Sequence, residues 1–222
     1  MVRFVPVSDI RFVLASASPR RRQLLSLLGY PFEVLVSGVE EDDHQDAGPA
    51  NYVLQTARNK ARAVFGTLKP DPSGARLLVI AADTTVAQDD VILGKPASPA
   101  EAREMLLALR GRTHEVHTAM TVIDLGAARE ESVVHTASVT MRHYNDAELE
   151  AYLDTGDPLD KAGAYAIQHP VFRPVERLSG CYLGVVGLPL CHLIPLLRKL
   201  NVPDRHDPAA LVDSHRGMTH AP

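Results

Sequence analysis

Residues 76–83 read Arg-Leu-Leu-Val-Ile-Ala-Ala-Asp, an apolar run that ends in a carboxylate. Such a run is typical of a β-strand that is covered on both faces, so we expect a strand over Arg76–Ala82 in an α/β fold. A carboxylate at the end of this strand needs a cation, a metal ion or hydrogen-bond donors, because burying it alone is costly. Ligands of α/β proteins bind at the carboxyl ends of strands, which makes Asp83 the first candidate site residue. The alternative for Asp83 is a cap on the following turn.

The chain before this strand alternates between strand and helix. Ser18 suits an N-cap, Pro19 the first position of a helix and Gly29 its C-terminal stop. The other expected elements are a strand over 11–15, a strand over 32–37, and a helix over 51–65 that Gly66 ends.

The chain after this strand begins with a predicted hairpin, in which residues 85–87 and 91–93 flank Gln88-Asp89-Asp90. Ser98 and Glu101 have the spacing of a capping box at the start of the next helix. The remaining expected elements are strands over 116–123 and 133–141, and helices over 145–152 and 188–200.

The bulk composition is that of a globular protein with one core or two closely packed lobes: of 222 residues, 45% are hydrophobic and 23% charged. No apolar run approaches the about 20 residues that span a bilayer, and no signal-like segment opens the chain, so we expect a cytoplasmic protein without a membrane partner. The net charge of −4 without a basic stripe argues against nucleic acid. Cys181 and Cys191 have no metal-ligand spacing, and we expect two buried free thiols.

Two lysines are expected near Asp83. A hairpin centred on Asp89 sets Lys95 close to Asp83 across the ladder, where the two form a salt bridge or together hold a metal ion and a phosphate. Lys60 lies on the apolar face of its helix. Its ammonium either reaches back to the surface or points into a cleft.

Three further segments offer ligand groups. Ser16-Ala17-Ser18-Pro19-Arg20 resembles a phosphate cradle, since a helix start and an arginine both favour an anion. The acidic loop Glu40–Asp43 is either solvated or supplies one carboxylate to a magnesium site with Asp83. In Asp160–Gln168, glycine permits close backbone approach and Gln168 offers a donor and an acceptor to a base edge, the alternative being a tight turn with Tyr165 in the core. His114 and His117 have no metal spacing, and we treat them as structural.

Six segments in this order resemble the Maf family of nucleotide pyrophosphatases. They are Leu14-Ala15-Ser16-Ala17-Ser18-Pro19-Arg20-Arg21, Ala82-Asp83-Thr84, Leu93-Gly94-Lys95-Pro96, Gly111-Arg112-Thr113-His114-Glu115-Val116, Asp160–Gln168 and Val185-Val186-Gly187-Leu188-Pro189-Leu190. The resemblance spans about 11–200. It implies an α/β fold with an elongated mixed sheet and two lobes around a nucleotide cleft, commonly in a homodimer. We therefore divide the chain into an N-terminal extension (1–10), a Maf-like domain (11–202) and a tail that we expect to be disordered (203–222).

The resemblance also implies a reaction and roles for single residues. The reaction is Mg²⁺- or Mn²⁺-dependent cleavage of a nucleoside triphosphate between its α and β phosphates. By position, Asp83 matches the proton acceptor and Glu41 an acidic metal-site residue, so both are candidate metal ligands. Lys60 and Lys95 match phosphate-facing lysines, and Ser16 and Arg20 match the phosphate loop.

The choice of substrate depends on a few positions. Arg20, Thr84 and the Ile167-Gln168 pair resemble the branch that acts on dTTP and UTP, not the branch that prefers 7-methyl-GTP. Two residues depart from the family pattern: His169 replaces a glycine, and Gly184 stands where asparagine is common. We expect both to reshape the base pocket. The alternatives are a broader pyrophosphatase for modified nucleotides and a nucleotide-sensing regulator of cell division.

Overall fold

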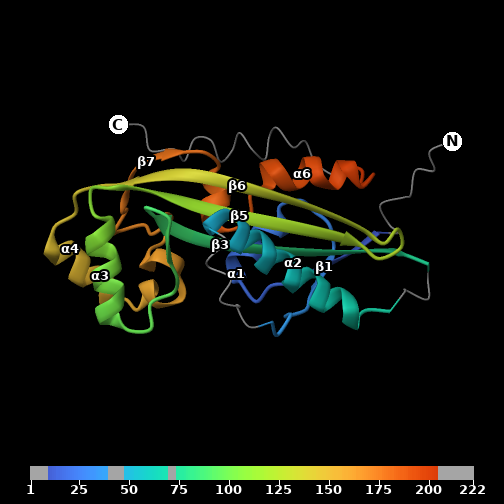
Figure 1. The fold of residues 1–222 in the computed structure, drawn as a ribbon, viewed down its shortest axis with the longest axis horizontal. Helices are drawn as coiled ribbons and strands as arrows, with labels where there is room; N and C mark the ends of the chain where they lie inside the picture. The colour runs from blue at the N-terminus through green and yellow to red at the C-terminus, as the bar shows by residue number, and fades with distance from the viewer. Residues whose placement is uncertain (1–9, 40–47, 70–73, 205–222) are drawn as a thin grey trace.

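A mixed seven-stranded sheet with helices on both faces forms the fold in the computed structural model, which describes residues 10–39, 48–69 and 74–204 (Figure 1). The strand order is β2-β1-β3-β5-β6-β7, and β4 pairs with β3. β1 pairs in parallel with β2 and β3, and all other neighbours are antiparallel. The expected elongated mixed α/β sheet is therefore confirmed.

The elements follow one another from strand β1 to helix α6. The strands are β1 (Ile10–Leu14), β2 (Phe32–Val34), β3 (Arg76–Gln88), β4 (Val91–Leu93), β5 (Thr113–Asp124), β6 (Arg129–Met141) and β7 (Val175–Ser179). The α-helices are α1 (Pro19–Ser26), α2 (Pro49–Thr67), α3 (Pro99–Leu109), α4 (Asp146–Leu153), α5 (Tyr182–Val186) and α6 (Leu190–Lys199). Two short 3₁₀ helices are η3 (Asp157–Asp160) and η4 (Ala162–Ala164).

The two faces of the sheet pack against different helices because side chains alternate along a strand. On β3, Leu78 and Ile80 pack in one cluster with leucines of α1 and α6. Val79 and Ala81 point the other way and pack against Ala61 and Val64 of α2. Figure 1 shows α6 and α2 on opposite sides of the sheet, with α3 and α4 at one end.

A separate hydrophobic cluster lies at the α3–α4 end. It contains Leu106 and Leu109 of α3, Leu149 and Tyr152 of α4, and Tyr165 of the following loop. The expected two lobes are thus the two ends of one continuous sheet, each with its own apolar core.

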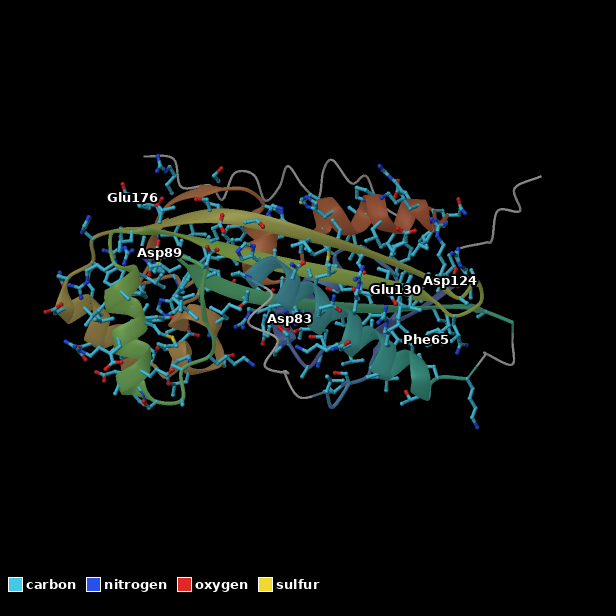
Figure 2. The ribbon with its side chains drawn as sticks, viewed as in Figure 1. Phe65, Asp83, Asp89, Asp124, Glu130 and Glu176 are labelled. Atoms are coloured by element: carbon cyan, nitrogen blue, oxygen red, sulfur yellow. The ribbon has the colours of Figure 1, made fainter. Side chains whose placement is uncertain are left out.

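Strand β3 is longer than its apolar run predicts. It continues to Gln88, so Asp83 lies within the strand and not at its end. The extension arises because β5 pairs with β3 from Leu78 to Ala87, which holds the polar residues after Ala82 in the ladder. Figure 2 shows Asp83 midway along the sheet, between Asp89 at the α3 end and Asp124 at the other.

Several other boundaries differ from the prediction. α2 runs through Gly66 to Thr67, so this glycine does not end the helix. The predicted hairpin is present, but its turn has two residues, Asp89 and Asp90, because Gln88 pairs with Val91. Both turn residues have positive φ, as in the two-residue turns whose twist matches that of the paired strands. β7 and α5 were not predicted: β7 is short and largely exposed, and α5 has only five residues.

The two domain boundaries also shift slightly. Ile10, placed in the expected extension, is buried in β1 and pairs with Arg76. Asp204, placed in the expected tail, forms an ion pair with Arg198 at 2.6 Å. Residues 1–9 and 205–222 lie outside the described residues. No helix in the described ranges is long and apolar enough to cross a bilayer.

Candidate functional site

The centre of β3 has an open edge. β1 pairs with this edge up to Ile80, and β4 pairs with it again from Val86. Between these two ladders, residues 81–85 have no strand partner on this edge within the described ranges. A strand edge that has no neighbouring strand in the middle of a sheet leaves room for a ligand to approach the side chains of that strand.

A cavity of about 630 Å³ lies at this gap, within the size range of small-molecule sites. Its lining residues come from segments that are far apart in the sequence. They include Ser16–Arg21 of the β1–α1 loop and helix start, residues 83–86 of β3, Lys60 of α2, Gly94 and Lys95 after β4, Lys161, Ala162, Tyr165–Gln168 and Val185–Gly187. The six resembling segments therefore include most of the lining.

Asp83 and Lys60 form an ion pair in this cavity. Lys60 Nζ lies 2.6 Å from Asp83 Oδ1, and the two side chains are only 14% and 8% exposed. Asp83 pairs with Ala119 in the ladder, and Ala119 packs with Val53 and Ala57 of α2. Asp83 therefore points toward the α2 face, where Lys60 meets it, and Lys60 does not reach back to the surface. The Lys60 ammonium therefore offsets part of the cost of burying the Asp83 carboxylate.

Thr84 points to the opposite face and meets Arg21 of α1. Arg21 donates from Nη2 to Thr84 Oγ1 at 3.1 Å, from Nη1 to Ser16 Oγ at 3.3 Å, and from Nε to the Gly187 carbonyl at 3.0 Å. One guanidinium thus connects the β1–α1 loop, β3 and the end of α5. The sequence pattern did not single out Arg21, because Arg20 is equally close to the loop and only the helix direction distinguishes them.

Thr118 extends this second network. Its hydroxyl donates to the Gly184 carbonyl at 2.8 Å, and its Oγ1 lies 3.0 Å from Thr84 Oγ1. Thr118 is fully buried and pairs with Thr84 in the β3–β5 ladder. No sequence signal identified Thr118, because its position depends on the register of two long strands.

The β1–α1 loop has the local structure that a phosphate cradle requires. Ser18 is the N-cap of α1 and accepts from the Arg21 N–H, with Pro19 at the helix start, as predicted. Ser16 Oγ accepts from the Ser18 N–H at 3.3 Å. Ser16, Ser18 and the first residues of the helix all line the cavity. The loop is therefore pre-ordered before any anion binds.

Arg20 lies across the cavity mouth from η3. Its Nη1 is 3.7 Å from Asp160 Oδ2, and Asp160 is 68% exposed, so this ion pair is weak. Asp160 also pairs with Lys161, which binds Asp157 as well. Arg20 is thus free to turn toward an anion at small cost.

Lys95 is the second cavity lysine, and it is exposed. The β3–β4 ladder ends at Val86–Leu93, and its register is one residue away from the one that would set Lys95 opposite Asp83. The expected pairing of Lys95 with Asp83 across the ladder is therefore wrong. Both residues still line the same cavity, and in the described part of the chain Lys95 has no ion pair.

The side of the cavity assigned to the base is formed by the Lys161–Gln168 segment. Gly163 has φ of +68°, and a Cβ there would lie 3.0 Å from Val86 Cγ1, so this contact with β3 requires glycine. The Gly163 N–H donates to the Gly94 carbonyl at 3.1 Å, which ties the segment to Lys95. Gln168 is exposed at the cavity edge, with its amide open to a ligand.

Tyr165 belongs to the core and also contacts the cavity. It is 6% exposed, and its hydroxyl lies 2.7 Å from His114 Nε2. Burial lowers the pKa of His114 to about 4 and raises the pKa of Tyr165, so both are neutral near pH 7. His117 contacts Thr136 and Glu115. The contacts of both histidines are with neighbouring side chains of the fold. The described residues contain no cluster of three or more His, Cys, Asp or Glu side chains placed to hold a metal ion.

The two departures from the family pattern lie outside the cavity lining. His169 packs on Tyr152 and accepts from the Phe172 N–H through Nδ1. Gly184 faces His135, whose Cδ2 would lie 2.6 Å from a Cβ at this position. Neither residue lines the cavity, so a direct contact with the base is not seen at either position, and their effect on the base pocket stays a prediction.

Seven of the eight predicted site residues are described, and all seven line the one cavity. They are Ser16, Arg20, Lys60, Asp83, Thr84, Lys95 and Gln168. Glu41 lies outside the described residues. An anion-binding loop, a paired carboxylate and several cations around one cavity define a site for a phosphorylated small molecule.

The comparisons with known proteins agree with this class. The family model described as Maf-like protein matches residues 11–200, and the chain belongs to this family. It is 44% identical over 200 residues to a dTTP/UTP pyrophosphatase of Bordetella parapertussis, with 86% of this chain and 93% of the relative covered. It is 43% identical over 192 residues to a dTTP/UTP pyrophosphatase of Caldicellulosiruptor bescii, with 86% of this chain and 94% of the relative covered.

A relative of the same name in Pasteurella multocida is 40% identical over 199 residues, with 88% and 98% covered. Among solved structures, the Staphylococcus aureus Ham1 protein matches with 13% identity and a TM-score of 0.45, covering 86% of this chain and 99% of that one. This structural likeness is too low to carry an argument.

Proposed function

We propose that this protein hydrolyses dTTP and UTP to the nucleoside monophosphate and pyrophosphate. Its relatives at 40–44% identity are named dTTP/UTP pyrophosphatases, and they match nearly their whole length. The observation that carries the proposal is the Lys60–Asp83 ion pair at the open edge of β3, in the same cavity as the Ser16–Arg21 loop. The chain is therefore a nucleoside triphosphate diphosphatase.

In the proposed mechanism Asp83 orients a water molecule and accepts its proton as the oxygen attacks the α-phosphorus. The bond from phosphorus to the α–β bridging oxygen breaks, and pyrophosphate leaves. Lys60 holds the carboxylate in place, since its ammonium lies 2.6 Å away. Lys95 and Arg20 stabilise the negative charge that develops on the phosphates, where positioning and electrostatics supply most of the catalysis.

We also propose that the site holds a divalent metal ion. Mg²⁺ binds through one or two carboxylates together with phosphate oxygens and water, and Asp83 supplies such a carboxylate at the cavity wall. Asp83, with Glu41 as the second predicted ligand, would hold Mg²⁺ or Mn²⁺. When bound, the ion neutralises charge on the phosphate oxygens.

A substrate panel tests the proposed activity. Pyrophosphate release is measured from dTTP, UTP, CTP, GTP and 7-methyl-GTP, each with magnesium and with a chelator. We expect release that requires magnesium and is fastest with dTTP and UTP. Faster turnover of another base would leave the reaction standing and reject the substrate assignment, and tight binding without turnover would favour a nucleotide sensor.

Hydrolysis in ¹⁸O-labelled water tests the position of attack. Attack at the α-phosphorus places the label in the monophosphate, and mass spectrometry of both products reads it directly. Label in the pyrophosphate would show attack at the β-phosphorus, in which case Asp83 does not hold the water where we propose.

The family resemblance also leads us to propose a homodimer that acts in the cytoplasm. Light scattering on the purified chain tests the dimer, which would have twice the 24.1 kDa mass of the chain. A mass equal to that of one chain at micromolar concentration would reject it.

A further inference from the structure

Cys181 and Cys191 lie next to each other, outside the cavity lining. Cys181 is the N-cap of α5, and Cys191 is the second residue of α6. Their Sγ atoms are 3.0 Å apart, and His192 Nδ1 is 3.1 Å from Cys191 Sγ. Neither cysteine is in a disulfide, as expected, but both are half-buried, so the expectation that they are buried is wrong. The proposed hydrolysis uses neither of them.

The distance between the two sulfur atoms is close to that of a covalent bond. A disulfide has an S–S length of about 2.05 Å, so the sulfur atoms need to approach by only about 1 Å. The two cysteines are ten residues apart, with α5 and the Gly187–Pro189 turn between them. A small movement of the two side chains therefore brings the sulfur atoms to bonding distance.

We propose that Cys181 and Cys191 are a peroxide-sensitive thiol pair that closes to a reversible disulfide and clamps one wall of the cavity. Two other roles for the pair are less well supported. A metal site needs more ligands than this cluster offers, since the described residues contain no group of three or more suitable side chains. A purely structural role does not require the two sulfur atoms to face each other at 3.0 Å.

The geometry also assigns the order of attack. Cys191 Sγ donates a hydrogen bond to Cys181 Sγ at 3.0 Å, which places the Cys181 sulfur as the acceptor of the pair. The same hydrogen bond, followed by burial, raises the pKa of Cys191, which keeps it protonated. Thiolates are the nucleophiles of thiol chemistry, so Cys181 attacks first and Cys191 resolves.

The reaction balances with one hydroperoxide as the oxidant. The Cys181 thiolate attacks a peroxide oxygen, an S–O bond forms, the O–O bond breaks, and the hydroxide that leaves takes up a proton to give water. Cys191 sulfur then attacks the sulfur of this sulfenic acid. The S–S bond forms, the S–O bond breaks, and a second water leaves with the Cys191 proton. Two thiols lose two electrons and one peroxide gains them.

His192 is placed to move the proton in the second step. Burial lowers its pKa, so the imidazole is neutral near pH 7, and its Nδ1 is within hydrogen-bond distance of Cys191 Sγ. His135 lies beside it, with ring centroids 4.6 Å apart, and its Nε2 accepts from the Cys181 N–H at 3.0 Å. These contacts hold the Cys181 backbone in position for attack by the neighbouring thiol.

The segment between the two cysteines forms part of the cavity wall. Val185, Val186 and Gly187 line the cavity, and the Gly187 carbonyl binds Arg21. A disulfide between the two ends of this segment closes a small ring and removes conformational freedom from the unfolded chain. We expect the melting temperature of the oxidised protein to rise by about 5 °C, given the size of the chain.

The experiment uses the full-length protein, reduced and freed of reductant, with equimolar hydrogen peroxide added. The proposal predicts a mass loss of two hydrogens in one chain, loss of both titratable thiols, the rise in melting temperature, and reversal of all three by a dithiol. The C191S variant is expected to stop at the sulfenic acid, with one added oxygen on Cys181. The matched C181S variant is expected to react at least tenfold more slowly.

Four results would overturn the proposal. They are thiols that persist after peroxide, equal reaction rates for the C181S and C191S variants, a disulfide between two chains, and zinc that copurifies with the protein and is lost from both variants. A disulfide that forms without any change in melting temperature would reject the claim that it restrains the cavity wall. None of these measurements depends on nucleotide turnover, so they stand or fall separately from the proposed hydrolysis.

Discussion

Asp83 and Thr84 are neighbours in sequence but belong to two different networks, because they point to opposite faces of β3. On the α2 face, Asp83 pairs with the ammonium of Lys60 at 2.6 Å. On the α1 face, Thr84 binds the Arg21 guanidinium and lies beside Thr118, and Arg21 also donates to the Ser16 hydroxyl and the Gly187 carbonyl. One face thus holds a buried charge pair, and the other a hydrogen-bonded frame.

The difference suggests a division of tasks. A mostly buried ion pair costs desolvation free energy, so its presence at an open strand edge is better explained by chemistry than by stability. A guanidinium with three fixed acceptors orders the segments around it and determines the shape of the cavity. We therefore expect changes on the α2 face to alter the rate for all substrates, and changes on the α1 face to alter the preference among them.

The largest effect is expected from Asp83→Asn. This substitution keeps the shape and an acceptor for Lys60 but removes the proton acceptor, so we expect pyrophosphate release from dTTP to fall by about 10³-fold. A folded variant with near-normal turnover would remove Asp83 from the chemistry. Circular dichroism and denaturant unfolding of the same sample serve as the control for folding.

The second effect separates the two lysines. Lys60→Met removes the ammonium beside the mostly buried Asp83 carboxylate, so we expect turnover to fall by about 100-fold and the free energy of unfolding to fall by about 2 kcal/mol. Lys95→Met is the matched control, because Lys95 is exposed and has no ion pair among the described residues. It is expected to lose about 100-fold in turnover with less than about 0.5 kcal/mol in stability. Equal stability losses would argue against the paired state of Lys60.

The third effect concerns the frame on the α1 face. Arg21→Lys keeps the charge but cannot reach three acceptors at once, so we expect kcat/KM for dTTP to fall about tenfold and stability to fall by about 1 kcal/mol. Arg20→Lys removes a weak, exposed contact with Asp160 and is expected to leave stability unchanged within about 0.5 kcal/mol. If Arg20→Lys lowers the free energy of unfolding more than Arg21→Lys does, the hydrogen-bond network has been assigned to the wrong arginine.

The smallest effects are expected at the two departures from the family pattern. His169→Gly lies outside the cavity lining and is expected to change the ratio of dTTP to UTP turnover by less than about twofold. Gly184→Asn adds a side chain where His135 stands and is expected to cost about 1–3 kcal/mol in stability. Adding His135→Ala to Gly184→Asn removes this clash, so the double variant is expected to recover most of the loss. A large shift in base preference in His169→Gly would place His169 in the site after all.

The sequence predicted the α/β class, the order of most elements and seven residues of one cavity, because apolar runs, caps and turn residues are local signals. It did not predict that β3 passes through Asp83 to Gln88, since this depends on the β5 ladder. For the same reason it missed Arg21 and Thr118, which acquire their partners only through the register of strands and the direction of α1. The contact between Gly184 and His135 connects positions 49 residues apart and has no local signature.

The most direct test of the division between the two faces is the ratio of kcat/KM for dTTP to that for 7-methyl-GTP, measured in Asp83→Asn and in Thr84→Val. The account predicts that Asp83→Asn lowers both rates together and leaves the ratio unchanged within about twofold. It predicts that Thr84→Val changes the ratio by about tenfold while retaining most of the dTTP rate. A ratio that shifts in Asp83→Asn and stays constant in Thr84→Val would contradict the account.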